Sequence, residues 1–442
     1  MSNSRAETLL RLVDDSTKPL YEGRVEVVSG VMVEAAGVPA ALGEMCCIHR
    51  TNGEPVDAEV VGFRGSQTLL MPHGDLRGIA PDQRVTALRH AFEAPVGDGL
   101  LGRVLDGFGA PIDGGPQPMI DGTRPVHAEA PSPLERPLID ETLQTGVRTI
   151  DGFTTLGRGQ RLGIFAGSGV GKSSLLAQIT RGTDADVVVV CLVGERGREV
   201  RAFIEDALGD ERRERAVLLA ATSDRSPIER QMAPFVAMTI AEHFRDQGKD
   251  VLFVMDSVTR FATASREIGL AAGEPPTVRG YPPSFFATLP RLVERMGRTE
   301  RGSITGLLTV LLDADDPNEP VADTLRGLLD GHVFLSRDLA ERGHFPAIDV
   351  CASLSRLMPD LAEPDHLAAA ATLRELLSTW EEGRDLVEIG AYSPGTNPAL
   401  DRAIETFPLI DQFTAQARAE HTPFEESINA MRVLSGVEGA EA

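Results

Sequence analysis

Between about residues 139 and 357, apolar runs of strand length alternate with helical patterns, and this alternation restricts the possible folds more than any other feature. One helical pattern places Ile228, Met232 and Val236 on the same face of a helix. Near-continuous apolar strands separated by helices are typical of a parallel sheet that is covered on both faces. The sequence therefore predicts an α/β domain. Its expected strands are Leu162–Phe165, Val187–Val193, Val217–Ala220, Val251–Met255 and Ile304–Leu311.

The segments on either side of this region have different patterns. Short apolar stretches between residues 21 and 90 are separated by Gly, Pro, Asn and Asp, which is typical of a small barrel or sandwich. Beyond about Pro359 the strand runs stop, and Leu361–Trp380 is rich in Ala, Leu and Glu, which favours helices. We therefore expect an N-terminal arm at residues 1–20, a β-barrel domain at 21–90, the α/β domain at 91–358 and a C-terminal helical domain at 359–442.

A glycine-rich loop follows the first expected strand and leads into a helical segment. The loop consists of Ala166, Gly167, Ser168, Gly169, Val170, Gly171, Lys172 and Ser173, and Ser174 begins the helix. Strand, loop and helix in this order form the context that the Walker A phosphate-binding pattern requires. The first glycine of that pattern is Ala166 here, while the remaining spacing is intact. The α/β domain is therefore expected to have a phosphate-loop (RecA-like) core.

The residue types of this loop suit the binding of a nucleoside triphosphate. Glycines allow backbone N–H groups to approach phosphate oxygens closely, and the following helix adds its positive N-terminal dipole. In such loops the lysine contacts the β- and γ-phosphates and the hydroxyl binds Mg²⁺, which gives these roles to Lys172 and Ser173. Lysine is otherwise rare in the chain, occurring only at Lys18 and Lys249, so chance is a poor explanation for Lys172.

A second phosphate-site signal is the apolar strand that ends in Asp256. In an open parallel sheet, ligands bind at the carboxyl ends of the strands. Asp256 is therefore expected to lie in the same crevice as the loop and to hold Mg²⁺ through water, which is the Walker B role. ATP and Mg²⁺ are the expected substrate and cofactor.

A third group of charged residues follows the valine-rich strand. Glu195 is the best candidate for a general base that activates water, and the adjacent Arg196 is placed to balance charge that develops on phosphate. The alternative is an ordinary helix start with a Glu in its first turn. Sequence reasoning about these residues alone leaves both interpretations open.

Several longer motifs resemble the type III secretion and flagellar export ATPases, which are relatives of the catalytic subunits of rotary ATP synthases. The resemblance extends from roughly Tyr21 to Phe413. The motifs that carry it are Gly159–Lys172, Gly194–Val200, Gly280–Ser284, Leu289–Arg295, Leu328–His332 with Ser336 and Arg337, and Ile389–Tyr392.

This resemblance implies a homohexameric ring that binds nucleotide at each subunit interface. It implies that Glu195 is the catalytic carboxylate, with Arg196 beside it, and that Arg260 lies near the γ-phosphate. It further implies that Arg356 is an arginine finger for the neighbouring subunit and that Phe345 stacks on adenine. Many relatives have Tyr at the Phe345 position, and Phe retains the aromatic face. A structural ion pair for Arg356 and a core position for Phe345 are the alternative interpretations.

The resemblance also implies partners: a regulatory stator-type protein at the N-terminal arm, an export gate, a stalk protein and chaperone–substrate complexes. It implies a cytoplasmic protein that associates peripherally with the export apparatus at the inner membrane. The net charge of −23 argues against a nucleic-acid partner, and so against an RNA translocase. The expected function is ATP hydrolysis that energises chaperone release and substrate loading, in a flagellar system. The alternatives are a virulence-type secretion ATPase, a rotary ATP synthase β-type subunit, and a scaffold with an inactive site.

Overall fold

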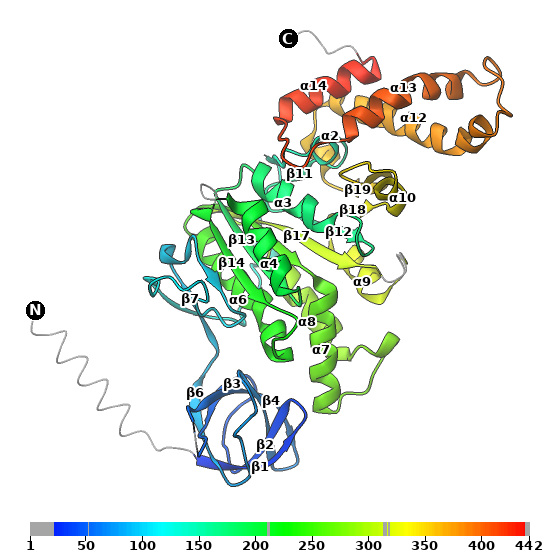
Figure 1. The fold of residues 1–442 in the computed structure, drawn as a ribbon. Coiled ribbons are helices and arrows are strands. Elements are labelled where there is room, and N and C mark those ends of the chain that lie inside the picture. Colours follow the sequence, from blue (N-terminus) through cyan, green and yellow to red (C-terminus); the bar gives the residue numbers. More distant parts are fainter. Residues whose placement is uncertain (1–21, 52, 210–212, 313–315, 317–318, 438–442) are drawn as a thin grey trace, which may run out of the picture. The chain divides into compact units, whose positions relative to one another are not determined.

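The computed structural model describes residues 22–437 except 52, 210–212, 313–315 and 317–318 (Figure 1). The described chain divides into two compact units. One contains residues 22–93 with the short segments Ser226–Ile228 and Glu267–Glu274, and the other contains the rest. The arm at residues 1–20, where a regulatory partner is expected, lies outside the described residues.

Residues 22–91 of the first unit form a closed antiparallel barrel, as the fold prediction expected. Its interior is filled by apolar side chains that are fully or almost fully buried, among them Val33, Leu70 and Val85. Pairing of the first strand with the last closes the barrel, so neither strand is left with an open edge. The strands in spatial order are β1 (Glu22–Ser29), β2 (Met32–Ala36), β5 (Gln67–Pro72), β4 (Val56–Arg64), β3 (Glu44–Ile48) and β6 (Arg84–Ala91).

The second unit is built on one large, mainly parallel sheet, so the α/β prediction is confirmed. The strands in spatial order are β19 (Ile348–Ser355), β18 (Gly331–Leu335), β12 (Arg161–Ala166), β17 (Ser303–Leu311), β15 (Asp250–Asp256), β13 (Val187–Val193), β14 (Ala216–Ala221) and β8 (Val104–Leu105). The short β16 (Gly297–Arg298) pairs with β17, and β19 runs antiparallel to β18. The five predicted strands are the neighbouring β12, β17, β15, β13 and β14. Strands β18 and β19 escaped prediction because they include partly exposed residues and lack a continuous apolar run.

Both faces of this sheet are buried. In β13, for example, every residue is buried, although successive side chains point to opposite faces. On one face, apolar residues of the strands pack against Leu176 of α3 and Phe203 of α4. The helices and 3₁₀ turns between and around the strands are η1 (Asp98–Leu100), η2 (Pro133–Glu135), α2 (Arg148–Phe153), α3 (Lys172–Gly182), α4 (Gly197–Phe203), α6 (Pro227–Asp246), α7 (Val258–Ala272), η4 (Val278–Gly280), α8 (Pro283–Val293), α9 (Pro320–Leu328), α10 (Arg337–Glu341) and α11 (Met358–Leu361). A π-helical turn, η3 (Ile204–Leu208), continues α4. Two small ribbons pair β7 (Glu93–Val96) with β9 (Gly122–Pro125) and β10 (Thr142–Leu143) with β11 (Leu156–Gly157).

The end of the described chain is helical, as expected, and belongs to the same compact unit as the sheet. Three helices, α12 (Pro364–Glu388), α13 (Pro398–Thr414) and α14 (Phe424–Ser435), share an apolar core (Figure 1). Phe153 of α2 lies in this core and contacts the Phe413 ring edge-on. A short helix near the start of the α/β region thus joins the C-terminal helices to the sheet.

Within the described residues, no helix has both the length and the apolar character that are needed to cross a membrane.

Candidate functional site

The candidate site lies where the carboxyl ends of four parallel strands meet. The register pairs Ala166 at the end of β12 with Leu311 at the end of β17, and Leu192 of β13 with Asp256 at the end of β15. Because neighbouring parallel strands end at the same edge of a sheet, the loops that follow them converge there. Those loops contain the glycine-rich segment and Glu195, and Arg260 lies in the first turn of the helix that follows β15.

The glycine-rich loop borders a cavity of about 500 Å³. Helix α3 begins at Lys172, and the preceding Gly171 has φ 102°, in the region that glycine favours. A Cβ atom on Gly171 would lie 3.3 Å from the Phe345 ring, so a side chain at this position would press on that ring. The cavity is lined by Gly167, Ser168, Gly169, Gly171, Lys172, Ser173, Ser174, Gly194, Glu195, Arg196, Glu199, Ser223, Arg260 and Leu311. Ala166 and Val170 of the loop are buried.

Lys172, which lines the cavity, forms a buried ion pair with Asp256. The Lys172 ammonium donates a hydrogen bond to Asp256 Oδ1, and the hydroxyl of Thr309 donates to the same oxygen at 2.7 Å. Both partners are more than nine-tenths buried, which makes their mutual attraction stronger than it would be in water. The structure therefore brings the predicted Walker A lysine and Walker B aspartate into direct contact.

Glu195 lies next to this pair, with Oε1 3.7 Å from Lys172 Nζ. Burial, with the Asp256 carboxylate as the next cause, raises the pKa of Glu195 to about 7. A hydrogen bond with Glu195 lowers the pKa of Glu199, so the neighbouring carboxyl group stays ionised at a lower pH. A carboxylate that exchanges its proton near neutral pH suits general-base chemistry.

Arg196 and Arg260 also line the cavity, but they are more exposed. The Arg196 guanidinium donates to Glu199 at 3.4 Å. Arg260 lies in the first turn of α7 and packs closely on Gly194, where an added Cβ atom would come within 2.8 Å of Arg260 Cβ. Both arginines therefore supply positive charge to the cavity that Glu195 also lines.

The structure does not bring Arg356 into this cavity. Arg356 directly follows β19, whose last residue, Ser355, pairs with Gly331 at the start of β18. Gly331 pairs in turn with Leu162 near the start of β12, whereas the glycine-rich loop follows the other end of β12. Arg356 is exposed at the opposite edge of the sheet, and its backbone N–H donates to the Asp330 carbonyl at 2.9 Å.

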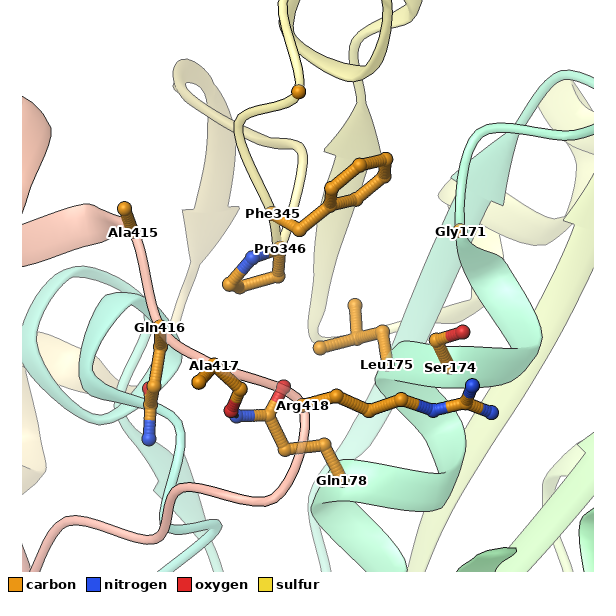
Figure 2. A pocket seen from close by; sticks show the side chains of 11 residues that line it. Gly171, Ser174, Leu175, Gln178, Phe345, Pro346, Ala415, Gln416, Ala417 and Arg418 are labelled. Carbon is orange, nitrogen blue, oxygen red and sulfur yellow. Dashed lines mark hydrogen bonds between the residues drawn. The ribbon is translucent and has the colours of Figure 1, made fainter.

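A second cavity of about 520 Å³ adjoins the loop, and Phe345 forms one side of it (Figure 2). Phe345 is 43% exposed, so its ring is available to a ligand. Leu175 and Gln178 of α3 form another side. An open apolar slot with an aromatic wall beside a phosphate loop has the character of a nucleobase site.

The remaining wall of this second cavity is a segment that the sequence analysis missed. It consists of Ala415, Gln416, Ala417 and Arg418, which follow α13. Arg148 holds the segment: its backbone N–H donates to the Gln416 side-chain oxygen at 2.9 Å, and its Nε donates to the Phe413 carbonyl at 2.8 Å. The Gln416 backbone N–H donates to the Phe345 carbonyl at 2.8 Å. No local pattern marks these residues, because long-range packing alone brings them to α3.

The oxygen atoms available as metal ligands at this site suit a hard divalent cation. Ser173 offers an exposed hydroxyl oxygen at the start of α3, and Asp256 offers a carboxylate that is in contact with Lys172 of the cavity lining. Oxygen ligands of this kind suit Mg²⁺, which usually binds one or two carboxylate or hydroxyl groups together with substrate phosphates.

Most of the chain matches domains of two known protein families. Residues 146–355 match the nucleotide-binding domain of the ATP synthase alpha/beta family, and residues 25–89 match the beta-barrel domain of that family. Residues 362–433 match the family described as T3SS EscN ATPase C-terminal domain.

Similar proteins of two kinds align with nearly the whole chain. The Flagellum-specific ATP synthase of Bacillus subtilis (strain 168) is 48% identical over 438 residues, which cover 98% of this chain and 100% of the relative. The Type 3 secretion system ATPase of Xanthomonas euvesicatoria is 50% identical over 416 residues, which cover 94% and 93%.

Solved structures agree with these matches. The assembled ATPase EscN from the type III secretion system of enteropathogenic E. coli superposes with a TM-score of 0.90 at 42% identity, covering 93% of this chain and 100% of that chain. The same ATPase in complex with its central stalk EscO superposes with a TM-score of 0.86.

Proposed function

This chain belongs to the ATP synthase alpha/beta family, in the branch of flagellum-specific and type III secretion ATPases, and from that membership we propose that it hydrolyses ATP to ADP and phosphate to energise type III protein export. The observation that carries the proposal is that Lys172, at a cavity bordered by the glycine-rich loop, lies close to both Asp256 and Glu195. A phosphate-binding lysine, a metal-holding carboxylate and a base with a pKa of about 7 are groups that ATP hydrolysis requires.

In this proposal each polar group at the cavity has one role. Backbone N–H groups of Gly167–Ser173 bind the phosphates, and Lys172 contacts the β- and γ-phosphates. Ser173 and Asp256 would hold Mg²⁺, which neutralises phosphate charge when it is bound. Glu195 orients the attacking water and takes its proton. Arg196 and Arg260 stabilise negative charge near the γ-phosphate.

The base-binding part of the site is the second cavity. Adenine stacks on Phe345 there, because the exposed ring faces a slot that is open next to the loop (Figure 2). Phe at this position retains the aromatic face that stacking needs.

The active assembly in this proposal is a homohexameric ring. Arg356 lies on the opposite edge of the sheet from its own loop, so it serves as an arginine finger for the site of the next protomer. Each site is then complete only when two protomers are in contact. The assembled state named for the EscN structures supports this arrangement.

We place the ATPase in flagellar export, where turnover releases chaperones from their substrates and loads the substrates at an export gate. A stalk protein in the ring, a stator-type regulator at the N-terminal arm and peripheral docking at the cytoplasmic face of the inner membrane complete the proposal. Identities to flagellar and to virulence-type relatives overlap, at 48% and 50%, so a genetic test has to separate the two systems. Deletion of the gene should abolish motility and leave effector secretion intact; the reverse result would assign the chain to a virulence system.

Phosphate release from purified protein tests the chemistry. We expect Lys172→Ala to lose both nucleotide binding and turnover, while Lys249→Ala, the matched lysine control away from the loop, retains both. Glu195→Gln should bind nucleotide and fail to hydrolyse it, because it lacks the base but keeps the shape. Full turnover by Lys172→Ala or Glu195→Gln would contradict the assignment.

A further inference from the structure

The phosphate cavity and the base cavity join at one place on α3. Gly171 and Ser174 line both of them. Under the proposed function, on which this inference rests, adenine lies at Phe345 and the β- and γ-phosphates lie at Lys172. The ribose and the α-phosphate connect these parts of ATP, so they have to pass the junction at Gly171 and Ser174.

Arg418 is a cationic side chain at this junction. It belongs to the wall segment after α13 and lines the base cavity. Figure 2 shows its side chain extending along the cavity, opposite Phe345, with the guanidinium group directed toward Ser174. The side chain is 56% exposed, so the guanidinium is open to a ligand.

Asp206 is the counter-ion of Arg418 in this structure. The Arg418 guanidinium donates to Asp206 Oδ2 at 2.5 Å, and the Asp206 side chain is 40% exposed. Ion pairs with this exposure contribute little net free energy, because water and salt weaken them. An anionic ligand at the junction can therefore take the place of Asp206 at small cost.

The backbones of the two partners are held together without this ion pair. Arg181 at the end of α3 donates one hydrogen bond to the Asp206 carbonyl and another to the Arg418 carbonyl. Changing the side chain of Asp206 or of Arg418 thus leaves the wall segment attached to α3 and to the π-helical turn. The side-chain pair is free to serve binding rather than folding.

We propose that Arg418 is a nucleotide-binding residue that contacts the α-phosphate, and that nucleotide binding exchanges its Asp206 partner for phosphate oxygens. A planar guanidinium matches phosphate geometry and binds it with charge-assisted hydrogen bonds. Asp206 competes with the ligand for the same cation. Because this ion pair has to break before phosphate binds, Asp206 lowers the affinity for nucleotide.

Substitutions of the two partners of this ion pair should change nucleotide affinity in opposite directions. Substitutions of the two partners of a purely structural salt bridge would not. Arg418→Gln should weaken the binding of ADP and AMP roughly fivefold, the effect of a partly exposed charged contact. Asp206→Asn should tighten both, roughly twofold to fivefold, because it removes the competitor. Adenosine lacks the phosphate, so its affinity should not change in either variant.

The experiment measures dissociation constants of ADP, AMP and adenosine for the full-length protein, by displacement of a fluorescent ADP analogue. Arg201→Gln and Glu205→Gln are the matched controls, since these residues form an exposed ion pair of their own on the adjoining turn of helix. Unchanged melting temperatures establish that all four variants are folded. The controls should bind all three ligands like the unaltered protein.

A decrease in affinity in both Arg418→Gln and Asp206→Asn would overturn the proposal, and so would an effect on adenosine as large as the effect on AMP. Failure of the proposed function is distinguishable, because then the unaltered protein would not bind ADP and Lys172→Ala would make no difference. If ADP binds and depends on Lys172 while both pair variants bind normally, only the role of Arg418 is wrong.

Discussion

A mixing experiment tests whether Arg356 completes the site of a neighbouring protomer. The register places Arg356 beyond Ser355, next to Gly331 and Leu162, whereas the loop begins at Ala166. Leu162 and Ala166 are four residues apart on β12, which is about 13 Å of extended strand and more than an arginine side chain can reach. Arg356 therefore cannot contact phosphate on its own loop in this fold.

The expected turnover of mixed rings follows from the fraction of sites that contain both Lys172 and Arg356. Arg356→Ala and Lys172→Ala should each be nearly inactive, since loss of an arginine finger costs roughly 10³–10⁵ in rate. In rings formed from equal amounts of the two variants, a site works when a protomer with Lys172 adjoins one with Arg356. Each condition holds about half the time, so about one quarter of the sites regain both groups. Turnover should recover toward that fraction of the unaltered protein.

Phosphate release at a fixed total protein concentration, high enough for assembly, provides the assay. An equal mixture of unaltered protein with Lys172→Ala is the control, because it shows how strongly inactive sites inhibit their neighbours. If this control stays active while the two-variant mixture gives no more than the sum of its components, Arg356 does not act between protomers and the ring mechanism fails.

Three further predictions concern other parts of the molecule. Phe345→Ala should weaken ADP binding by about 1–3 kcal/mol, the usual contribution of one stacked base, while Phe345→Tyr should bind normally in the same displacement assay. Because burial raises the pKa of Glu195 to about 7 and the carboxyl accepts a proton only when ionised, turnover should rise as pH increases through about 7; a rise centred between pH 4 and 5 would contradict this. Glu242→Ala should lower the free energy of unfolding by about 3–5 kcal/mol, because it leaves Arg295 buried without its carboxylate partner, whereas Glu388→Ala in an exposed pair should cost at most about 1 kcal/mol by urea unfolding.

The sequence was sufficient to predict the elements that are encoded locally. Apolar runs of strand length predicted the five central strands, because a strand that is buried on both faces has to be apolar throughout. The loop before α3 and the carboxylate at the end of β15 were recognised from residue type and spacing, since phosphate binding needs glycine, lysine and hydroxyl groups in a fixed order. Strands β18 and β19 were missed, because partly exposed strands lack that continuous apolar signal.

Tertiary structure decided how groups far apart in the chain meet. The contact between Lys172 and Asp256, and the burial that raises the pKa of Glu195, depend on how the strands are ordered in the sheet. The base cavity depends on a wall around Arg418 that carries no motif.

The sequence by itself thus predicted the chemistry of the candidate site: a phosphate loop, a carboxylate expected to hold metal and a candidate base. Only the folded chain decided that Arg356 lies at the other end of the strands from its own loop and that Arg418 lines the adjoining base cavity. The physical reason is that local patterns report backbone conformation and burial, whereas distances between remote residues follow from the packing of whole elements.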